Sequence, residues 1–218
     1  MYVSLFKRLI DIVVAFTMLV ILAPLLLIIY LILLTEGENP IFSQERVGLH
    51  EKVFTLVKFK SMRTLKDEKG NLLPNHLRIT LVGKFLRKTS LDELPQLFNV
   101  IKGDMSFIGP RPLFELYLPY YKEEEKIRHN VRPGITGLAQ ISGRHMLNWD
   151  AKLGYDVYYV KNLSFKLDCK IFFKTIVSIL LTRGVLVHDP TLYLNDERRD
   201  MILQKGSADL ISNNLHNN

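Results

Sequence analysis

An uninterrupted apolar run near the N-terminus restricts the possible folds of this chain more than any other feature. Residues 12–34 carry no charged side chain; Lys7, Arg8 and Asp11 precede them, and Glu36 follows. As a helix, this run is about 35 Å long, which is enough to cross the apolar layer of a bilayer. A signal peptide would have a shorter run followed by a cleavage site of small residues. We therefore predict a helix that stays in the membrane.

Pro24 lies near the middle of this run. Proline removes one backbone hydrogen bond and bends a helix, so we expect a bend at this residue. Hydropathy alone leaves open whether the bent helix crosses the membrane or turns back. Lys7 and Arg8 are expected at the level of the lipid headgroups, where they could meet lipid phosphates.

The charge of the chain indicates an acidic partner. Its formal net charge is +7 and its pI is near 9.4. Nucleic acid and an anionic membrane face both suit such a charge. No DNA- or RNA-binding motif accompanies it, so we expect membrane lipids and no nucleic acid as partners. The single cysteine, Cys169, excludes an internal disulfide.

The remainder of the chain mixes strand and helix patterns, which predicts a small α/β (α+β) domain. Residues 41–47 and 53–59 read as the two strands of a hairpin. Residues 113–128 have a helical pattern that Pro119 should kink or break. Residues 167–182 form an apolar helical pattern with one polar stripe, which suits either the membrane interface or packing against the domain.

These patterns divide the chain into three parts. We expect a membrane helix in residues 1–38, a globular domain in residues 39–195 and a polar, disordered tail in residues 196–218. Nothing indicates internal repeats or a long linker.

Two adjacent carboxylates, Asp92 and Glu93, stand before a short apolar helical pattern at residues 94–102. One interpretation is a capping box, in which Ser90 and Glu93 satisfy backbone donors at the helix start. Pro95 favours the other, because proline fits best at the first helical position and would place both carboxylates before the helix. In either case the nearby helix end should depress the pKa of Asp92 and attract phosphate.

After this helix, Arg111 lies between Pro110 and Pro112 in a rigid turn. A carboxylate nucleophile, a helix end and a fixed guanidinium together suggest phosphoryl transfer. As an isolated pattern, however, the acidic pair is equally compatible with a purely structural role.

Three blocks of sequence give the chain a resemblance to a known family. They are Lys58–Arg63 (K-F-K-S-M-R), Ser90–Pro112 (S-L-D-E-L-P…G-P-R-P) and Arg132–Arg144 (R-P-G-I-T-G-L-A-Q-I-S-G-R). In this order and spacing they resemble the bacterial sugar transferases, the monotopic polyprenyl-phosphate phosphoglycosyl transferases that initiate glycan assembly. The resemblance extends from about residue 7 to about residue 183. It implies a re-entrant membrane helix broken at Pro24, with both ends on the cytoplasmic face of the bacterial inner membrane.

The resemblance also implies roles for individual residues. Asp92 would be the nucleophile, and Asp92 and Glu93 would hold Mg²⁺. Asp156 and Asp168 would be supporting acids that orient basic side chains near the catalytic centre. Phosphate groups of the substrates would bind to a basic set comprising Lys58, Lys60, Arg63, Arg111 and Arg144. Where the family often has serine, arginine, tryptophan and asparagine, this chain has Ala23, Lys60, Leu138 and Ser142.

The reaction implied by the resemblance is transfer of a sugar 1-phosphate from a UDP-sugar to polyprenyl phosphate, with release of UMP and through an aspartyl phosphosugar intermediate. A non-catalytic membrane scaffold for glycosyltransferases is the alternative, and it would tolerate the loss of both carboxylates. A basic nucleic-acid binder is a further alternative, which would lose affinity steeply as salt rises.

Overall fold

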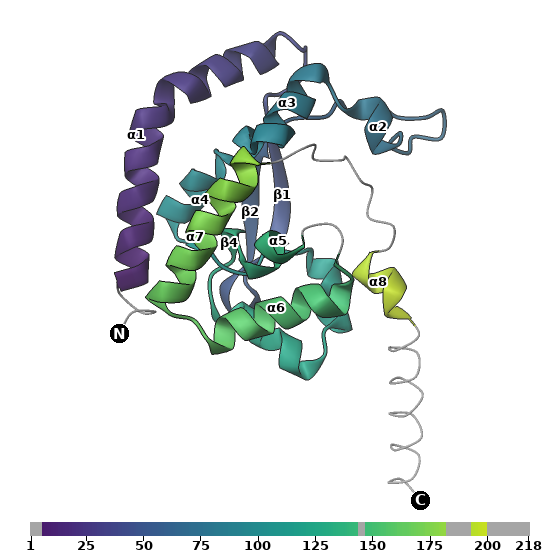
Figure 1. Cartoon of the computed structure of the whole chain (residues 1–218). Helices are drawn as coiled ribbons and strands as arrows, with labels where there is room; N and C mark the ends of the chain where they lie inside the picture. The colour runs from purple at the N-terminus through teal and green to yellow at the C-terminus, as the bar shows by residue number, and fades with distance from the viewer. Residues whose placement is uncertain (1–5, 144–146, 182–192, 200–218) are drawn as a thin grey trace, which may run out of the picture.

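The first element of the structure is a long, bent apolar helix. The structure is a computed structural model that describes residues 6–143, 147–181 and 193–199. Helix α1 (Lys7–Leu34) contains Pro24, and Figure 1 shows it bending sharply into two limbs. Most of its large apolar side chains are exposed, and it is long and apolar enough to cross a membrane. The bend agrees with the one expected at Pro24, where the ring prevents a regular helical hydrogen bond.

The predicted hairpin is confirmed with the predicted bounds. Strand β1 (Ile41–Val47) pairs antiparallel with β2 (Val53–Phe59). A second small sheet pairs β3 (Ser106–Ile108) with β4 (Gly134–Thr136) in parallel. The described part of the chain is therefore a mixed α and β domain, as expected.

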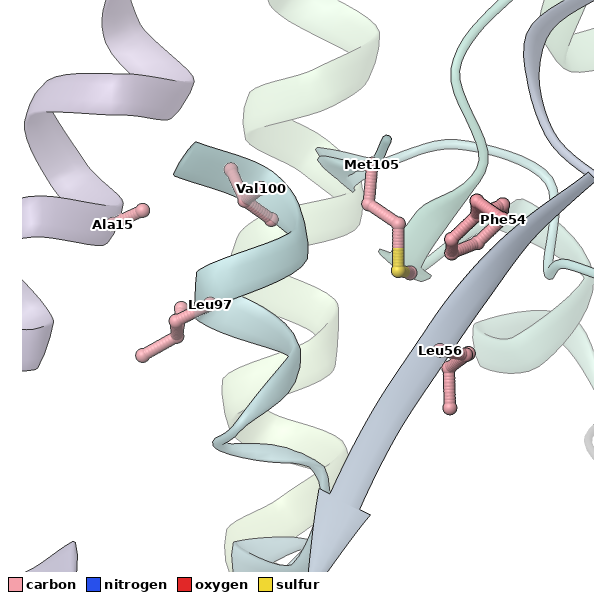
Figure 2. Packing of buried hydrophobic residues seen from close by; sticks show 6 residues of the cluster. All are labelled: Ala15, Phe54, Leu56, Leu97, Val100 and Met105. Atoms are coloured by element: carbon pink, nitrogen blue, oxygen red, sulfur yellow. The ribbon is translucent and has the colours of Figure 1, made fainter. Parts of the chain in front are cut away.

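One apolar core connects the membrane helix to the domain. Ala15 of α1 packs with Leu97 and Val100 of the short helix α4 (Gln96–Lys102). Figure 2 shows that α4 lies between α1 and strand β2. Phe54 and Leu56 of β2 form the other side of this core together with Met105, which follows α4 in the chain. Because α4 contacts both neighbours, the position of α1 is tied to the position of the hairpin.

The segment expected as one helix over residues 113–128 has a different form. It consists of two 3₁₀ helices, η4 (Glu115–Tyr120) and η5 (Glu123–Asn130), and Pro119 lies inside the first. A 3₁₀ turn tolerates the missing N–H of proline better than a continuous α-helix, so the predicted break is confirmed and the predicted α-helix is wrong. Tyr117 of η4 is buried beside Trp149.

The apolar pattern at residues 167–182 corresponds to helix α7 (Phe165–Leu180). Its Ile171 is fully buried, whereas Phe173 and Val177 are exposed. One face of α7 thus packs on the domain and another remains open, which leaves room for the predicted contact with a membrane interface. The other helical elements are η2 (Leu49–Glu51), α2 (Asn75–Arg78), α3 (Leu81–Thr89), η3 (Leu91–Glu93), α5 (Leu138–Ser142), α6 (Trp149–Lys161) and α8 (Leu194–Glu197).

The domain extends beyond the boundary predicted at residue 195. Helix α8 is followed by Arg198, which is buried. The guanidinium donates to Glu125 at 2.6 and 2.8 Å and to Asp150 at 2.5 Å. These ion pairs make residues 196–198 part of the domain. The rest of the predicted disordered tail, from residue 200 onwards, lies outside the described residues.

Candidate active site

Asp92 lies in a single 3₁₀ turn, η3, between helices α3 and α4. Ser90 adopts a left-handed conformation with φ of 57° and makes no capping hydrogen bond with its side chain. Pro95 is the residue that precedes α4, and Gly103 closes the helix with φ of 105°. The capping-box interpretation is therefore wrong, and the alternative favoured by Pro95 is confirmed. Both carboxylates come before the helix, where the chain can direct them to other partners.

The carboxyl group of Asp92 is almost removed from solvent, with 7 % of the residue exposed. Burial raises its pKa above the ordinary value, and the adjacent Glu93 raises it further. Three cations, Lys58, Arg87 and Arg111, oppose this rise. The expectation that the nearby helix end would depress this pKa is thus wrong in direction, because desolvation is the larger effect. Asp92 is a poorly solvated acid among three basic groups.

Glu93 links the acidic pair to the predicted arginine turn. The Arg111 guanidinium donates to Glu93 Oε1 at 3.1 Å. Glu93 raises the pKa of Arg111, so this guanidinium is charged at any ordinary pH. Its side chain is 52 % exposed, which leaves it accessible to a ligand. The structure therefore brings together the acidic pair and the arginine that the sequence singled out.

Lys58 reaches the same place from strand β2. Its ammonium group lies 5.1 Å from the ring centroid of Phe42, which pairs with it across the hairpin. Burial lowers the pKa of Lys58, and Asp92 is the largest influence in the opposite direction. A partly desolvated ammonium beside a desolvated carboxylate is held by mutual attraction and is available to an incoming phosphate.

Arg87 is a charged residue of the candidate site that was not among the residues predicted from the sequence. It lies on α3, and its Nε donates to Ser61 Oγ at 2.8 Å. Burial lowers its pKa and Asp92 raises it. One feature of the sequence could have indicated this role: Arg87 lies only five residues before Asp92, so it is close to the acidic pair along the chain.

Asp156 supports the site indirectly, through another arginine. It accepts from Arg128 Nε at 3.1 Å and from Nη2 at 3.0 Å, and both residues are buried. The same Nη2 donates to the backbone carbonyl of Arg111 at 2.6 Å. Asp156 therefore orients a basic side chain, as expected, and that side chain holds the turn that carries Arg111.

Two predicted phosphate-binding residues, Lys60 and Arg63, are not among the charged groups with the largest effects on the pKa of Asp92. Lys60 forms an ion pair with Glu38 and donates to Thr64 Oγ1 at 2.8 Å. Strand β2 ends at Phe59, so the chain turns away after Lys58 and carries both basic residues toward the end of α1. Arg144, the last of the predicted phosphate ligands, lies outside the described residues.

The expectation that Lys7 and Arg8 face lipid headgroups is also corrected. Lys7 is buried and donates to Asp168 at 2.6 Å, and the other oxygen of Asp168 accepts from Tyr159 at 2.8 Å. Arg8 donates to the carbonyls of Val100 and Ile101 at the end of α4. These contacts fasten α1 to the domain, and Asp168 serves this attachment.

The glycine-rich loop packs its backbone against the Gly109 turn over its described residues, 132–143. A Cβ on Gly134 would lie 2.1 Å from the amide nitrogen of Gly109, and one on Gly137 would lie 2.1 Å from its carbonyl oxygen. Real side chains do not fit at such distances. The glycines therefore allow two backbones to touch, which holds the loop beside the turn that leads to Arg111.

Asp92 and Glu93 can be tested for their fit to Mg²⁺. Among the described residues, no group of three or more His, Cys, Asp or Glu side chains could hold a metal ion. Magnesium is commonly bound by one or two carboxylates, with water and substrate phosphates completing its shell. Two adjacent carboxylates, one of them desolvated with a raised pKa, match that donor set. The pair fits a magnesium ion that the substrate also coordinates.

The sequence of this chain matches a known protein family. The family model described as "Bacterial sugar transferase" matches residues 2–182. The chain is 48 % identical over 180 residues to the "Uncharacterized sugar transferase EpsL" of Bacillus subtilis, covering 82 % of this chain and 89 % of that protein. It is 41 % identical over 195 residues to the "Undecaprenyl-phosphate galactose phosphotransferase" of Salmonella typhimurium, covering 82 % and 41 %.

A third relative has a different named sugar. The "UDP-N-acetylgalactosamine-undecaprenyl-phosphate N-acetylgalactosaminephosphotransferase" of Aeromonas hydrophila is 40 % identical over 191 residues, covering 82 % of this chain and 44 % of that protein. The chain thus spans less than half of the two relatives named for a reaction, and nearly all of the first.

Proposed function

This chain belongs to the bacterial sugar transferase family, and we propose that it transfers a sugar 1-phosphate from a UDP-sugar to polyprenyl phosphate, releasing UMP. Relatives named for galactose and N-acetylgalactosamine transfer to undecaprenyl phosphate support the reaction class. The observation that carries the proposal is the desolvated carboxylate of Asp92 among Lys58, Arg87 and Arg111. The diphosphate of the donor needs cations that neutralise its charge, and the nucleophile that attacks its phosphorus must lie among these cations.

In the proposed first step, a carboxylate oxygen of Asp92 attacks the sugar-bearing phosphorus of the donor. The bond from this phosphorus to the bridging oxygen breaks, and its electron pair leaves with UMP. Asp92 must be ionised for this attack, and the three cations favour that form. Because burial strips water from the carboxylate, little solvent has to be displaced when it reacts.

In the second step, a phosphate oxygen of the polyprenyl phosphate attacks the phosphorus of the aspartyl phosphosugar. The bond to Asp92 breaks and the carboxylate is restored, together with a polyprenyl diphosphate sugar. Arg111, held by Glu93 and by the bond from Arg128 to its carbonyl, would orient the phosphoryl oxygens in both steps. Mg²⁺, if bound at Asp92 and Glu93, would neutralise charge on the donor diphosphate.

The membrane helix gives this reaction its location. One substrate is a lipid and the other is soluble, so the site has to lie at the boundary between membrane and water. The core of Ala15, Leu97 and Val100 joins α1 to the helix that follows Asp92. The bend in α1 supports a helix that enters the membrane and returns. We propose that the domain lies on the cytoplasmic face.

The test is a donor half-reaction with the full chain in membranes or nanodiscs. UDP-galactose, UDP-N-acetylgalactosamine and UDP-glucose are supplied separately with Mg²⁺ and without lipid acceptor, and the reaction is quenched with acid. We expect one donor to release UMP in an amount close to that of the enzyme and to leave a sugar-phosphate adduct on the peptide containing Asp92.

Two variants test whether the reaction needs Asp92 and the acidic pair as a whole. Asp92→Asn should give no adduct and no transfer, because an amide is not a nucleophile, whereas the exposed control Asp67→Asn should behave as the unchanged chain. An undiminished adduct in Asp92→Asn would refute the nucleophile assignment. Full transfer by a chain with both Asp92 and Glu93 changed to alanine, or absence of transfer with every donor, would refute the proposed chemistry.

A further inference from the structure

Arg46 of strand β1 is a partly buried cation that the proposed mechanism does not yet use. Its guanidinium stacks on the Phe114 ring, with 3.6 Å between its central carbon and the ring centroid. Its Nη2 donates to Gln44 Oε1 at 2.6 Å. Its Nε is buried and has no hydrogen-bond partner among the described residues. The Gln44 amide and the Phe114 ring therefore leave part of the hydrogen-bonding capacity of the Arg46 guanidinium unused.

The charge of Arg46 is not balanced by an acid. Among the described residues, no carboxylate forms an ion pair with it or acts on its pKa. Burial and then Arg111 lower the pKa of Arg46 to about 10, so the group is still protonated at neutral pH. A half-buried cation beside a second cation is unfavourable on its own. An anion bound between the two guanidinium groups would remove this cost.

The position of Arg46 distinguishes between the anions of the reaction. Arg46 stacks on Phe114, three residues after Arg111, and the neighbouring Val47 donates its N–H to the carbonyl of Leu113 at 3.0 Å. Arg46 therefore lies against the segment that follows Arg111, whereas the guanidinium of Arg111 contacts Glu93 of the acidic pair. A phosphate held between Arg46 and Arg111 is next to the phosphate that Asp92 attacks, and in a nucleoside diphosphate sugar that neighbour is the nucleotide phosphate.

The surroundings of Arg46 also favour the soluble substrate. Phe114 belongs to the apolar cluster of Tyr117 and Leu194, whereas the residues that pack on the membrane helix α1 form separate clusters. A lipid phosphate should approach from the α1 side. The nucleotide has no such restriction and can occupy the side of Arg111 that faces η4.

From these contacts we propose that Arg46, together with Arg111, binds the nucleotide phosphate of the donor and stabilises the charge that develops on it as it leaves. This role rests on the proposed function. When the carboxylate of Asp92 bonds to the sugar-bearing phosphorus, its negative charge is transferred to the departing UMP oxygen. Arg46 provides a hydrogen-bonded cation at that end of the bond and so lowers the barrier to departure.

The test compares Arg46→Met with a control that also removes one positive charge from the hairpin. Arg46→Met keeps an apolar stem against Phe114, and Lys52→Met changes an exposed residue of the hairpin loop. The full chain in nanodiscs is titrated with UMP by calorimetry. Transfer is then measured against donor concentration and against undecaprenyl phosphate concentration, and thermal unfolding reports folding.

We expect Arg46→Met to raise the Kd for UMP by at least about tenfold, the loss of one charged hydrogen-bonding group. The kcat should fall as well, while the KM for undecaprenyl phosphate stays within about twofold. Arg46→Lys should recover part of the UMP affinity because it restores the charge without the planar fork. Lys52→Met should match the unchanged chain in every constant. If Arg46→Met fails to fold, Arg46→Gln, which keeps a planar group over Phe114, replaces it.

Three results would overturn the inference, and they are separable. Unchanged UMP affinity in a folded, neutral Arg46 variant of an active enzyme removes this role and leaves the proposed function intact. A rise in the KM for undecaprenyl phosphate with UMP affinity unchanged would assign Arg46 to the lipid phosphate instead. Absence of UMP binding and of transfer in the unchanged chain would remove both the proposed function and the role of Arg46.

Discussion

The buried ion pair between Asp156 and Arg128 offers a sharp test of how the site is supported. Asp156→Asn preserves the shape of the side chain but removes its charge, which leaves the Arg128 guanidinium buried without a counterion. Arg128 is 3 % exposed and Asp156 is 5 % exposed, so water cannot replace the lost carboxylate. Removing one partner of such a pair costs about 3–5 kcal/mol. For a chain of this size, that corresponds to a fall in Tm of about 6–20 °C.

The same change should reach the chemistry through the backbone of Arg111. Arg128 Nη2 donates to the carbonyl of Arg111 at 2.6 Å, so a displaced Arg128 shifts the turn between Pro110 and Pro112. A misplacement of about 1 Å can lower a rate by about 100-fold. We therefore expect a much lower kcat at a temperature well below the new Tm, with the protein still folded.

Differential scanning calorimetry and steady-state kinetics on the same preparation would measure both effects. Glu123→Gln is the matched control, because it also removes a carboxylate from an ion pair, with Lys126 at 2.7 Å, but this carboxylate is 75 % exposed. Its cost should be below about 1 kcal/mol. An Asp156→Asn protein as stable as Glu123→Gln would refute the assignment of Asp156 to a buried support, and an unchanged kcat in a destabilised protein would refute its connection to Arg111.

Three further predictions concern pH and packing. Since burial raises the pKa of Asp92 and Lys58 opposes the rise, kcat/KM for the donor should increase with pH through that pKa, and Lys58→Met should move this limb to higher pH. Burial lowers the pKa of His129 from 6.5 to about 4, so between these pH values the folded protein binds fewer protons than the unfolded protein. The free energy of unfolding should therefore fall by about 3 kcal/mol between pH 7 and pH 4, and by less in His129→Gln. Denaturant titrations at both pH values would measure this difference. Gly83→Ala should cost about 1–3 kcal/mol and weaken the Arg87 contact, because its Cβ would lie 1.9 Å from the Ser61 carbonyl oxygen, and a normal Tm would contradict this.

The fold was most predictable where it depends on local sequence. Two short strand-like runs on either side of the turn at Gly48, Leu49 and His50 identified strands β1 and β2 with the observed bounds. Pro95 and Gly103 marked the two ends of α4 for opposite reasons: the proline ring fixes φ and removes the N–H, whereas glycine readily adopts the left-handed conformation that closes the helix. The segment around Pro119 was less predictable, since the choice between α and 3₁₀ turns depends on the packing of Tyr117 against Trp149.

The site was predictable in its acids and in Arg111, but only in part for its other basic residues. Lys58 and Lys60 are two residues apart and look equivalent in the sequence, yet β2 ends between them: Asp92 raises the pKa of Lys58, whereas Lys60 pairs with Glu38. Arg87 was not among the predicted site residues, because its contact with Ser61 joins positions 26 residues apart. A pattern along the chain does not report where a strand ends or which distant hydroxyl orients an arginine.

The longest of these contacts determines what the membrane helix contributes to the reaction. Lys7 and Asp168 are 161 residues apart in the chain and form a buried ion pair, which no local pattern could indicate. The pair fastens the start of α1, and Ala15 then packs on the α4 residues that follow Asp92, the proposed nucleophile. Strand β2, which carries Lys58, packs on the other side of α4, as Figure 2 shows. A shift of α1 would therefore move Lys58 and Asp92 relative to each other. The membrane helix is thus also a structural part of the proposed active site.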